Sequence, residues 1–475
     1  MAATTARTIK NGTIALERKT IDDLRGRLRG TILLPGVPGY NEARSLWNGI
    51  VDRRPALIAR CTNVTDVIAA VNFGREQNLV IAIKGGGHNV TGNAMCDDGI
   101  VIDLSPLRRC DVDADRRMVR VEAGALLGDL DAATQAHGLA TPIGINTTTG
   151  IAGLTLGGGI GHLMRRHGLT IDNLAAVEMV TATGERVRAA EDENVDLFWA
   201  VRGGGGNFGV VTSFTFRLHR VGPDLLSGMI LYRAERAREV LRFYQDHVRA
   251  APDSLGTIVS LRKAPPAPFI PASLHGAMVV GIVSCYCGGI EEGEKVLRPF
   301  RDLRPDLYAV KPRPFVEFQA MLDPTVPPGW HYYWKSHYLA PLSDAAIDVI
   351  VERAWRFRSP RSYTLLPHMG GAVARVPEDA TAFAGRDSAH AININGVWTA
   401  EDADRADDTA WVRDFFDAVM PYATGRAYIN FMGNEGQERV RAAYGEAKYA
   451  RLAMVKTRWD PDNVFRMNQN IVPSA

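Results

Sequence analysis

Apolar and polar residues follow two different periods along this chain, and each change of period marks a predicted element. Residues 55–60 are an apolar run typical of a short strand, and residues 66–75 carry apolar positions at helical spacing after the capping sequence 62–65. Residues 79–84 return to a strand pattern that stops at three glycines. The chain from 55 to 87 is therefore predicted to form a strand, a helix and a second strand that leads into a glycine turn.

The same two periods continue to about residue 217. Further predicted elements are strands at 99–104, 118–123 and 174–183 and a helix at 126–138 that ends at a glycine. Alternation of apolar and polar residues predicts one more strand over 210–217. This part of the chain is therefore predicted to mix helices with strands.

The pattern changes after Pro223. Strand-like runs alternate with amphipathic helical patterns between residues 224 and 424, separated by proline-rich connectors. The clearest are the predicted strands 278–286 and 390–398 and the predicted helices 234–248 and 345–357. Such an alternation is typical of an α+β domain with an antiparallel sheet. In the tail, residues 438–457 are predicted to form one helix.

Glycine is concentrated at residues 85–87, between residues 150 and 161, and at residues 203–209. Ordering glycine is entropically unfavourable, so such density favours a site where backbone N–H groups approach a ligand, most often a phosphate. His88 follows the first stretch directly. The residues alone therefore predict a nucleotide cofactor that is cradled by the backbone, with His88 beside its reactive end.

Neither of two common nucleotide-binding motifs applies to this chain. Gly204, Gly206 and Gly209 satisfy GxGxxG, but a helical pattern precedes them and a strand pattern follows. The dinucleotide-binding fold requires the opposite order, a strand before the motif and a helix after it. The sequence contains no GxxxxGK followed by Ser or Thr, which excludes a P-loop as well.

Length and composition narrow the class of protein. The 475 residues suggest two or three domains, and 46% hydrophobic with 23% charged residues is ordinary for a globular protein. A net charge of +2 without a block of Lys and Arg argues against a nucleic-acid-binding protein. No apolar run reaches the about 18 residues of a membrane span, and the first residues lack the pattern of a secretion signal.

The five cysteines are scattered without a CxxC pair, which favours a reducing compartment over a disulfide framework. Cys285 and Cys287 would share one face of a strand, where packing is commoner than metal binding. We therefore expect a cytoplasmic protein that binds no metal, no nucleic acid and no membrane.

Several long motifs, in the same order along the chain, resemble those of flavin-dependent oxidases of the vanillyl-alcohol oxidase type, and most closely their berberine-bridge-enzyme-like branch. They are KGGGHN at 84–89, TGIAGLTLGGGIGHLMRRHGLTIDN at 149–173, FWAVRGGGGNFGVVT at 198–212 and, in the tail, YIN at 428–430, AYG at 443–445, WDPDNVF at 459–465 and NQNI at 468–471. The resemblance extends from about residue 55 to the C-terminus.

The resemblance implies a fold of class α+β in three parts. Residues 1–222 would form a PCMH-type FAD-binding domain of two α+β subdomains, and residues 425–475 would complete it. Residues 223–424 would form an α+β substrate domain with an antiparallel sheet. The resemblance also implies FAD attached covalently, through its 8-methyl carbon, to His88. We expect a monomer or a homodimer.

The resemblance further implies which residues surround the FAD. They are Lys84, Gly85, Gly86, Gly87, His88, Asn89, Asn146, Thr149, Gly150, Gly153, Gly157, Gly158, Gly161, His162, Gly206, Gly209, Val210, Asn468 and Asn470. The N–H groups of residues 85–87 would face the pyrophosphate, and Lys84 would neutralise its charge. The stretch that begins at Gly150 would form the floor beneath the flavin.

Two positions distinguish members of the branch. Many carry a second flavin attachment through a cysteine, and this chain has Asn146 at that position. It therefore resembles the histidine-only subset, and in that respect the hydroxynicotine oxidases. Thr149 stands where members of the family gate the access of oxygen, and a small residue there resembles the oxygen-permitting forms.

Tyr428, Asn430 and Asn393 are the expected catalytic residues. Period-two spacing predicts that Tyr428 and Asn430 emerge on one face of a strand. The resemblance makes Tyr428 an acid/base beside the flavin, a role that nearby positive charge would favour by lowering its pKa of about 10. The alternative is a tyrosine packed at a domain interface. Asn393 matches a position often held by Glu or Gln, and since an amide cannot abstract a proton it would orient the substrate.

Other side chains are alternatives for the same site. His390 or His368 could act as the base in place of Tyr428. Trp334, Tyr363 and Trp398 could form the walls of the substrate pocket or could belong to an aromatic core.

Together these residues predict an FAD-dependent oxidoreductase, in the first place an oxidase. A hydride would pass from an alcohol, sugar or amine carbon to flavin N5, and O2 would reoxidise the flavin to give H2O2. The alternatives are a dehydrogenase with another acceptor and a flavin- or small-molecule-binding protein without turnover. The middle domain carries no motif that identifies the small-molecule substrate.

Overall fold

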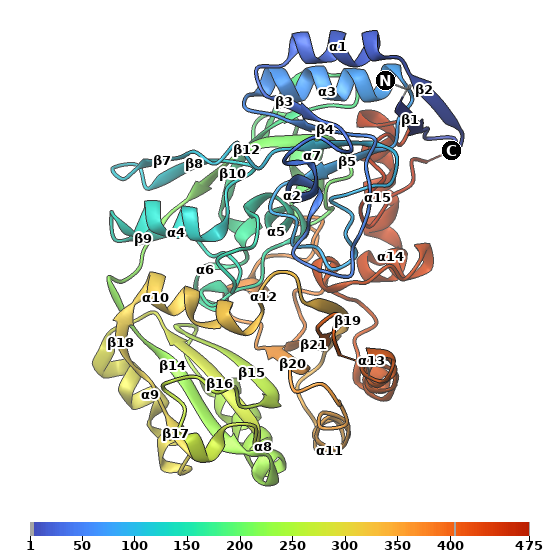
Figure 1. The fold of residues 1–475 in the computed structure, drawn as a ribbon. Helices are drawn as coiled ribbons and strands as arrows, with labels where there is room; N and C mark the ends of the chain where they lie inside the picture. The colour runs from blue at the N-terminus through green and yellow to red at the C-terminus, as the bar shows by residue number, and fades with distance from the viewer. Residues whose placement is uncertain (1–3, 403–404, 475) are drawn as a thin grey trace.

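The chain folds into two halves, one above the other, in the computed structural model of the protein, which describes residues 4–402 and 405–474 (Figure 1). The N-terminal elements, blue to green, and the last helices, red, make up the upper half. The lower half consists of the elements from the middle of the chain, yellow-green through orange to the red α13. Both ends of the chain therefore lie in the upper half.

The predicted strand–helix–strand unit is confirmed and supplies the first sheet. This four-stranded sheet has the order β3-β4-β6-β5, and β4 and β5 both run parallel to β6. Its elements are β3 (Thr31–Leu33), β4 (Leu57–Arg60), α3 (Val64–Glu76), β5 (Ile81–Lys84) and β6 (Ile100–Asp103). Helix α3 begins after Asn63, whose side-chain oxygen accepts a hydrogen bond from the N–H of Asp66 at 3.0 Å. The first glycine turn follows β5 at the carboxyl edge of the sheet.

A second, five-stranded sheet has the order β11-β10-β12-β8-β7 and is antiparallel throughout. Its strands are β7 (Cys110–Asp113), β8 (Met118–Glu122), β10 (Leu174–Val180), β11 (Arg186–Ala190) and β12 (Val210–Arg217). The same stretch of chain contains the helices α4 (Leu127–Gln135), α5 (Ile151–Gly157) and α7 (Val195–Val201). Helix α7 precedes the GxGxxG segment and β12 follows it, so the helix-before-strand context is confirmed. Short elements complete this half: β1 (Thr4–Arg7), β2 (Thr13–Leu16), α1 (Arg18–Arg27), α2 (Tyr40–Arg44), β9 (Leu139–Ala140), α6 (Met164–His167) and β13 (His219–Arg220).

The lower half is built on an antiparallel sheet of eight strands, as the pattern of residues 224–424 predicted. Seven strands follow the order β17-β14-β16-β15-β20-β21-β19, and β18 pairs with β14. The strands are β14 (Asp224–Arg233), β15 (Leu255–Lys263), β16 (Met278–Tyr286), β17 (Leu307–Tyr308), β18 (Lys311–Pro314), β19 (His331–Leu339), β20 (Tyr363–Pro367) and β21 (His390–Trp398). The helices are α8 (Ala237–Ala250), α9 (Ile290–Asp302), α10 (Phe315–Gln319), α11 (Asp344–Arg353), α12 (Ala372–Arg375) and α13 (Arg405–Val419).

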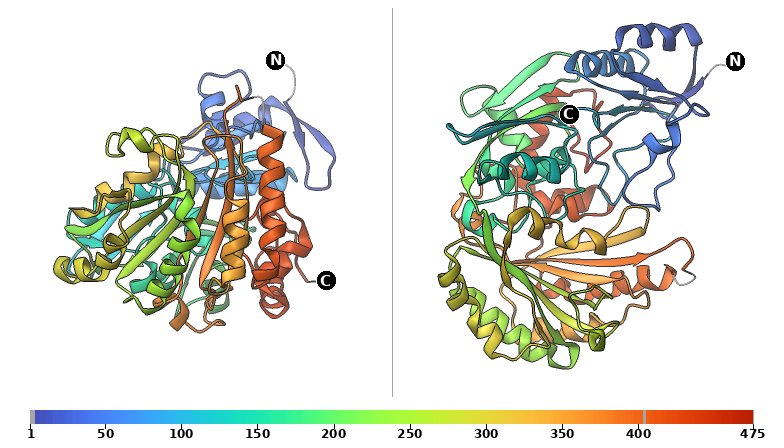
Figure 2. Two further views of the ribbon diagram at one scale, coloured as in Figure 1. Left: turned by 90° about the horizontal axis from the view of Figure 1, so that it is seen from below. Right: turned by 60° about the vertical axis from the view of Figure 1, so that its left-hand side comes forward.

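The two faces of this sheet have different neighbours. Helices α8, α9, α11 and α13 cover the face turned away from the upper half (Figures 1 and 2), and Ile392 and Ile394 of β21 pack among them. The alternate residues of β21, Asn393 and Asn395, face the upper half. Every residue of β21 is buried. The Ile–Asn–Ile–Asn sequence is therefore that of a strand with one apolar and one polar buried face.

The tail returns to the upper half as two helices, α14 (Gln437–Tyr444) and α15 (Glu446–Trp459). The single helix predicted over 438–457 is wrong, because Gly445 has a φ of +79° and ends the first helix. Residues 429–431 form a 3-10 helix, so the strand predicted to carry Tyr428 and Asn430 is also wrong.

One hydrophobic core joins the tail to the N-terminal region. It combines residues between Ala6 and Leu218 with Ala382 and with residues between Ala427 and Ile471. A separate core holds apolar residues between Leu226 and Val419. The tail is therefore packed as part of the upper half. Within the described residues, no helix is long and apolar enough to cross a membrane.

A buried ion pair holds the end of this tail. The side chains of Lys456 and Asp460 are fully buried, and the Lys456 ammonium also donates to the carbonyls of Asn207 (2.7 Å) and Phe465 (3.0 Å). Asp460 accepts hydrogen bonds from two backbone N–H groups of the following turn, at 2.8 Å each. Burial lowers the pKa of Lys456 to about 8, and the charge of Asp460 opposes this effect. The pair ties α15 to the glycine-rich loop at 203–209.

We expect Asp460→Ala to lower the free energy of unfolding by about 3–5 kcal/mol, because it leaves the Lys456 ammonium buried without its counter-ion. The matched control is Asp22→Ala, which removes an exposed partner of Arg18 and should change that free energy by about 1 kcal/mol or less. Urea unfolding followed by circular dichroism measures both. Equal losses in the two variants would contradict a structural role for the buried pair.

Candidate active site

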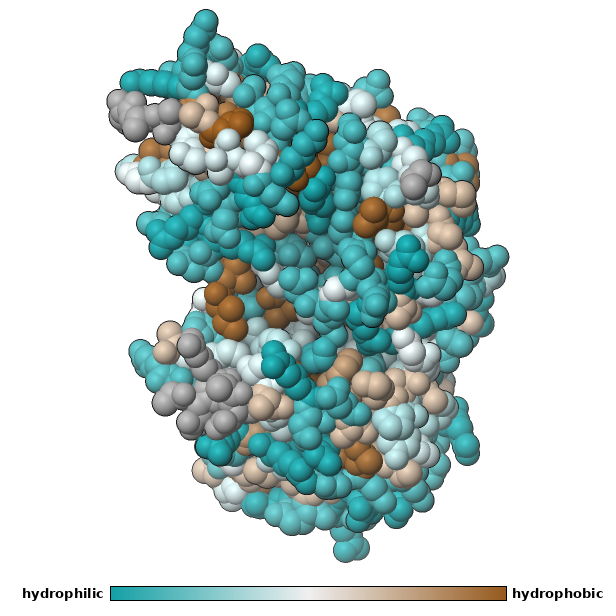
Figure 3. All heavy atoms as spheres, turned by 90° about the vertical axis from the view of Figure 1, so that its right-hand side faces the viewer, coloured by the Kyte–Doolittle hydropathy of each residue, from teal (hydrophilic) through white to brown (hydrophobic). Residues whose placement is uncertain are grey.

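A cavity lies between the two halves, where the glycine turns, the tail and the polar face of β21 meet. Its lining includes His88 and Gly150 from the N-terminal region, Tyr363 and Asn393 from the lower sheet, and Tyr428 from the tail. On the face shown in Figure 3 the surface is hollowed between the halves, and hydrophobic residues gather there. Among the described residues that line the cavity, none is Lys, Arg, Asp or Glu.

The two glycine stretches touch each other at Gly86 and Gly150. A methyl group added at Gly86 would lie 2.4 Å from the backbone nitrogen of Gly150, and one added at Gly150 would lie 2.4 Å from the nitrogen of Gly86. Gly87 has a φ of +66°, a conformation that favours glycine. A methyl group at Gly153 or Gly206 would meet no atom within 4 Å. Since both residues line the cavity, their backbones are accessible to a ligand.

His88 lies beside this contact, half-buried, with its Nε2 atom enclosed. Its ring stacks on Trp47 at a centroid distance of 4.1 Å, and Trp47 stacks in turn on Tyr332 of β19 at 3.7 Å. The Nε2 atom has no hydrogen-bond partner among the residues that the structure describes. Desolvation lowers the pKa of His88 to about 4, so the imidazole is neutral and nucleophilic at pH 7. Sequence reasoning missed Trp47, which belongs to none of the motifs.

The hydroxyl of Tyr428 is held by two hydrogen-bond donors. Its oxygen accepts from the backbone N–H of Gly159 at 2.9 Å and from the Asn430 amide at 2.8 Å. Burial raises the pKa of Tyr428, and the two donors act in the opposite direction because they stabilise an anionic oxygen. No Lys or Arg is present in the described cavity lining, so the positive charge that would favour the base role is not found there and burial leaves the pKa raised.

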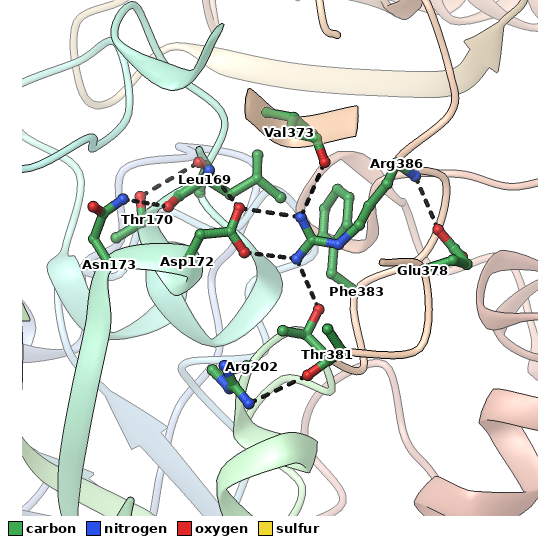
Figure 4. Close-up of polar contacts among 12 residues, drawn as sticks. Leu169, Thr170, Asp172, Asn173, Arg202, Val373, Glu378, Thr381, Phe383 and Arg386 are labelled. Atoms are coloured by element: carbon green, nitrogen blue, oxygen red, sulfur yellow. Dashed lines mark hydrogen bonds and ion pairs between the residues drawn. The ribbon is translucent and has the colours of Figure 1, made fainter. Parts of the chain in front are cut away.

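A buried ion pair holds the loop behind Tyr428 (Figure 4). The guanidinium of Arg386 donates to both carboxylate oxygens of Asp172, at 2.7 and 3.1 Å. The loop that contains Arg386 also carries Phe383, whose ring centroid lies 6.1 Å from that of Tyr428. A methyl group at Gly158 would lie 2.5 Å from the Phe383 ring, so this glycine allows the ring to approach. The pair therefore supports the wall against which Tyr428 packs.

Asn393 and Asn395 form a polar wall of the cavity. The amide of Asn395 donates to the backbone carbonyl of Asn393 at 2.8 Å. The Nδ2 atom of Asn393, the Oδ1 atom of Asn395 and the indole nitrogen of Trp334 have no partner in the described part of the chain. Trp334 and Tyr363 line the cavity, so of the two alternatives, pocket wall or aromatic core, the structure favours the pocket wall for both. Sequence reasoning missed Asn395, although its spacing of two from Asn393 on a predicted strand was the available signal.

Most of the predicted cofactor residues line the cavity: Gly85, Gly86, Gly87, His88, Asn89, Asn146, Thr149, Gly150, Gly153, Gly206, Gly209, Val210 and Asn468. The others are not among the lining residues: Lys84, Gly157, Gly158, Gly161, His162 and Asn470. The Lys84 ammonium donates to the carbonyls of Ala43 and Ser45, contrary to the expectation that it neutralises a pyrophosphate. His162 packs instead on Phe318, with 4.5 Å between the ring centroids.

The two histidines considered as alternative bases do not line the cavity. His390 lies on β21 with its Nε2 atom 3.1 Å from the side-chain oxygen of Gln245 in α8, and His368 lies 3.3 Å from Arg165. Even-numbered residues of β21 face away from the upper half, which also places Trp398 outside the cavity lining. His390, His368 and Trp398 are therefore not part of the described cavity lining.

The cavity fits FAD on several observations. The two glycine stretches bring backbone N–H groups to its edge, as a pyrophosphate requires. Its lining includes enclosed polar atoms that have no partner within residues 4–402 and 405–474, namely His88 Nε2, Asn146 Oδ1, Asn393 Nδ2 and Asn468 Oδ1. Such atoms are normally hydrogen-bonded in a folded protein, so a polar ligand would satisfy them.

Comparison with known proteins supports the same cofactor. The family model for the FAD binding domain matches residues 55–190, and the model for berberine and berberine-like proteins matches residues 427–472. An FAD-linked oxidoreductase of Dictyostelium discoideum is 32% identical to this chain, covering 94% of this chain and 95% of that protein. The chain belongs to the berberine-like FAD-linked oxidoreductases.

Solved structures share the fold of this FAD-dependent oxidoreductase. The 6-hydroxy-D-nicotine oxidase of Arthrobacter nicotinovorans has a TM-score of 0.84 at 27% identity, covering 94% of this chain and 98% of that one. The grass pollen allergen Phl p 4, which has glucose dehydrogenase activity, has a TM-score of 0.84 at 23% identity, covering 96% and 99%. The α+β fold of a PCMH-type FAD-binding domain with a second domain built on an antiparallel sheet is therefore confirmed.

We expect Gly86→Ala to lose most of its bound FAD, because the added methyl group would overlap the backbone of Gly150 and separate the two glycine stretches. The ratio of flavin absorbance to protein absorbance in the purified variant measures this loss. Gly26→Ala is the matched control, since its methyl group, in α1, meets no atom within 4 Å and should leave the ratio unchanged. Full flavin content in Gly86→Ala would show that the backbone contact is not needed.

Proposed function

We propose that the protein is an oxidase with covalently tethered FAD, which oxidises an alcohol, sugar or amine carbon of a small molecule and uses O2 as the electron acceptor. The observation that carries the proposal is the environment of His88. Its imidazole is neutral, stacks on Trp47 beside the glycine turn, and has an enclosed Nε2 atom without a partner in the described chain. This nitrogen would bond to the 8-methyl carbon of the flavin. Asn146, in place of a cysteine, leaves His88 as the single attachment.

FAD, when bound, supplies the redox chemistry, since it accepts a hydride from the substrate carbon and passes the electrons to O2. The residues of this chain supply proton transfer and orientation. Tyr428 takes the proton of the substrate hydroxyl or amine, because its oxygen accepts hydrogen bonds from Gly159 and Asn430 that stabilise the anion. Asn393 and Asn395 orient the substrate, since an amide cannot take the proton.

Two observations favour an oxidase over a dehydrogenase with another acceptor. Thr149, a small residue, lines the cavity next to Gly150, at the position that the family resemblance assigns to oxygen access. Of the two solved structures compared above, the one with the higher sequence identity is an oxidase. We also propose that residues 1–222 and 425–475 hold FAD while residues 223–424 bind the substrate, because the tail shares the N-terminal core.

We expect the wild-type protein to keep its yellow colour in the pellet after acid precipitation, and His88→Ala to release its flavin into the supernatant. The variant lacks the nitrogen that would form the bond. His162→Ala is the matched control, because this buried histidine lies outside the cavity lining and its loss should leave the colour in the pellet. A colourless wild-type pellet would contradict covalent attachment.

We expect Tyr428→Phe to slow the reduction of the flavin by substrate about 10²–10⁴-fold, the usual contribution of a general acid or base. Because burial raises the pKa of Tyr428 and the deprotonated oxygen is the base, the wild-type rate should rise with pH into the alkaline range. Asn430→Leu removes a donor that lowers this pKa, so the rise should move to higher pH. Anaerobic stopped-flow absorbance measures both effects, and an unchanged pH profile in Asn430→Leu would count against this role of the amide.

The substrate for these measurements comes from a panel of alcohols, sugars and amines, tested for bleaching of the flavin without air. Recovery of the colour when air is admitted supports an oxidase. A flavin that stays bleached in air identifies a dehydrogenase. If no compound bleaches it, a binding protein without turnover is favoured.

A further inference from the structure

Arg262 of β15 lies on the cavity-facing side of the lower sheet. It pairs with Tyr363 of β20, and Tyr363 pairs with Asn395 of β21. Residues directly opposite each other in antiparallel strands project from the same face. Tyr363 and Asn395 both line the cavity, so Arg262 is the next residue outward in the same row. The row places Arg262 two strands, or about 10 Å, from Asn395.

No acidic side chain among the described residues pairs with the guanidinium of Arg262. Its side chain makes no hydrogen bond or ion pair within the described residues, and its Nε atom is enclosed. The guanidinium lies over the ring of Tyr363, 5.2 Å from the centroid. Burial lowers the pKa of Arg262, and only the Tyr363 hydroxyl acts against this. Arg262 is half-buried, and because a guanidinium keeps its proton in proteins, its positive charge stays at this edge of the cavity without a carboxylate from the described residues.

Two other arginines of the lower half illustrate the usual pairing that Arg262 lacks among the described residues. Arg361 binds Asp402 at 3.1 Å, and Arg353 binds Asp414 at 2.7 Å. Ser260, two residues along β15 and therefore on the same face as Arg262, also has an enclosed hydroxyl without a partner in the part of the chain that the structure describes. Two adjoining polar groups on one face are thus left for a ligand to satisfy.

On the basis of the proposed function, we propose that Arg262 binds a carboxylate of the substrate. The substrate class is a planar alcohol or amine that carries this carboxylate at the end remote from the carbon that is oxidised. A guanidinium and a carboxylate fit each other through two parallel N–H···O bonds. Between the two ends of the substrate, Tyr363 and Trp334 provide aromatic surfaces for a ring. The hydroxyl or amine of the substrate would lie at Tyr428.

The experiment compares two probes that differ in the carboxylate, benzoate and benzyl alcohol, on the FAD-loaded protein. Binding is followed by tryptophan fluorescence, because Trp47 and Trp334 line the cavity and the signal needs no turnover. Arg262→Gln is expected to lower the affinity for benzoate relative to benzyl alcohol by about tenfold or more, as the loss of a hydrogen-bonded charge pair does. Arg262→Lys should keep part of the preference, because an ammonium cannot form the two parallel bonds.

Arg413→Gln is the matched control. Its guanidinium also lies over a tyrosine ring, 5.5 Å from the centroid of Tyr333, but Tyr333, unlike Tyr363, does not line the cavity. This variant should keep the wild-type preference for benzoate.

Two results would overturn the inference: a wild-type protein that binds benzoate no more tightly than benzyl alcohol, or an Arg262→Gln variant with the wild-type preference. If the Gln variant does not fold, the wild type and Arg262→Lys decide by the same comparison. The two proposals can fail separately. If benzoate binding depends on Arg262 but no compound bleaches the flavin, this inference is supported and the proposed oxidase is contradicted. If neutral alcohols bleach the flavin but benzoate binding does not depend on Arg262, the proposed oxidase is supported and this inference is contradicted.

Discussion

The backbone contact between Gly86 and Gly150 is the constraint on which the cavity depends. The first glycine follows β5 of the four-stranded sheet, and the second precedes α5. Because neither residue has a side chain, the two backbones approach closely enough to offer N–H groups to the same ligand. His88 comes two residues after Gly86, so the same approach determines where the imidazole lies.

The lower half contributes side chains to the walls of the cavity, and the upper half provides its glycine-rich backbone. The alternation along β21 sends Ile392 and Ile394 into the helix-covered core and Asn393 and Asn395 toward the upper half. Trp47 crosses the boundary, since it stacks on His88 on one side and on Tyr332 of β19 on the other. Unpartnered polar atoms of the described residues gather along this boundary, and this suits it to a polar ligand.

Elements with a clear local period could be predicted from the sequence. The unit at 55–87, β12 and β21 were predicted because apolar spacing and glycine stops are properties of neighbouring residues. In the tail, an amphipathic pattern continues across Gly445, so the break between α14 and α15 was not visible in the sequence. Tyr428 and Asn430 were assigned to a strand because side chains two residues apart lie on one side of a strand, whereas here a 3-10 turn brings the two side chains together. Trp47 could not be predicted, because its partner Tyr332 is distant in the sequence and nothing local marks the contact.

The return of the tail to the upper half makes the cavity depend on contacts between residues that are far apart in the sequence. Residues 427–471 share a core with residues 6–218 and provide Tyr428 and Asn468 to the cavity. While the chain is still being synthesised, the N-terminal region therefore exposes apolar surface that only the last helices cover. The cavity is therefore complete only once residues 427–471 have packed on the N-terminal region, so its formation is a late event in folding.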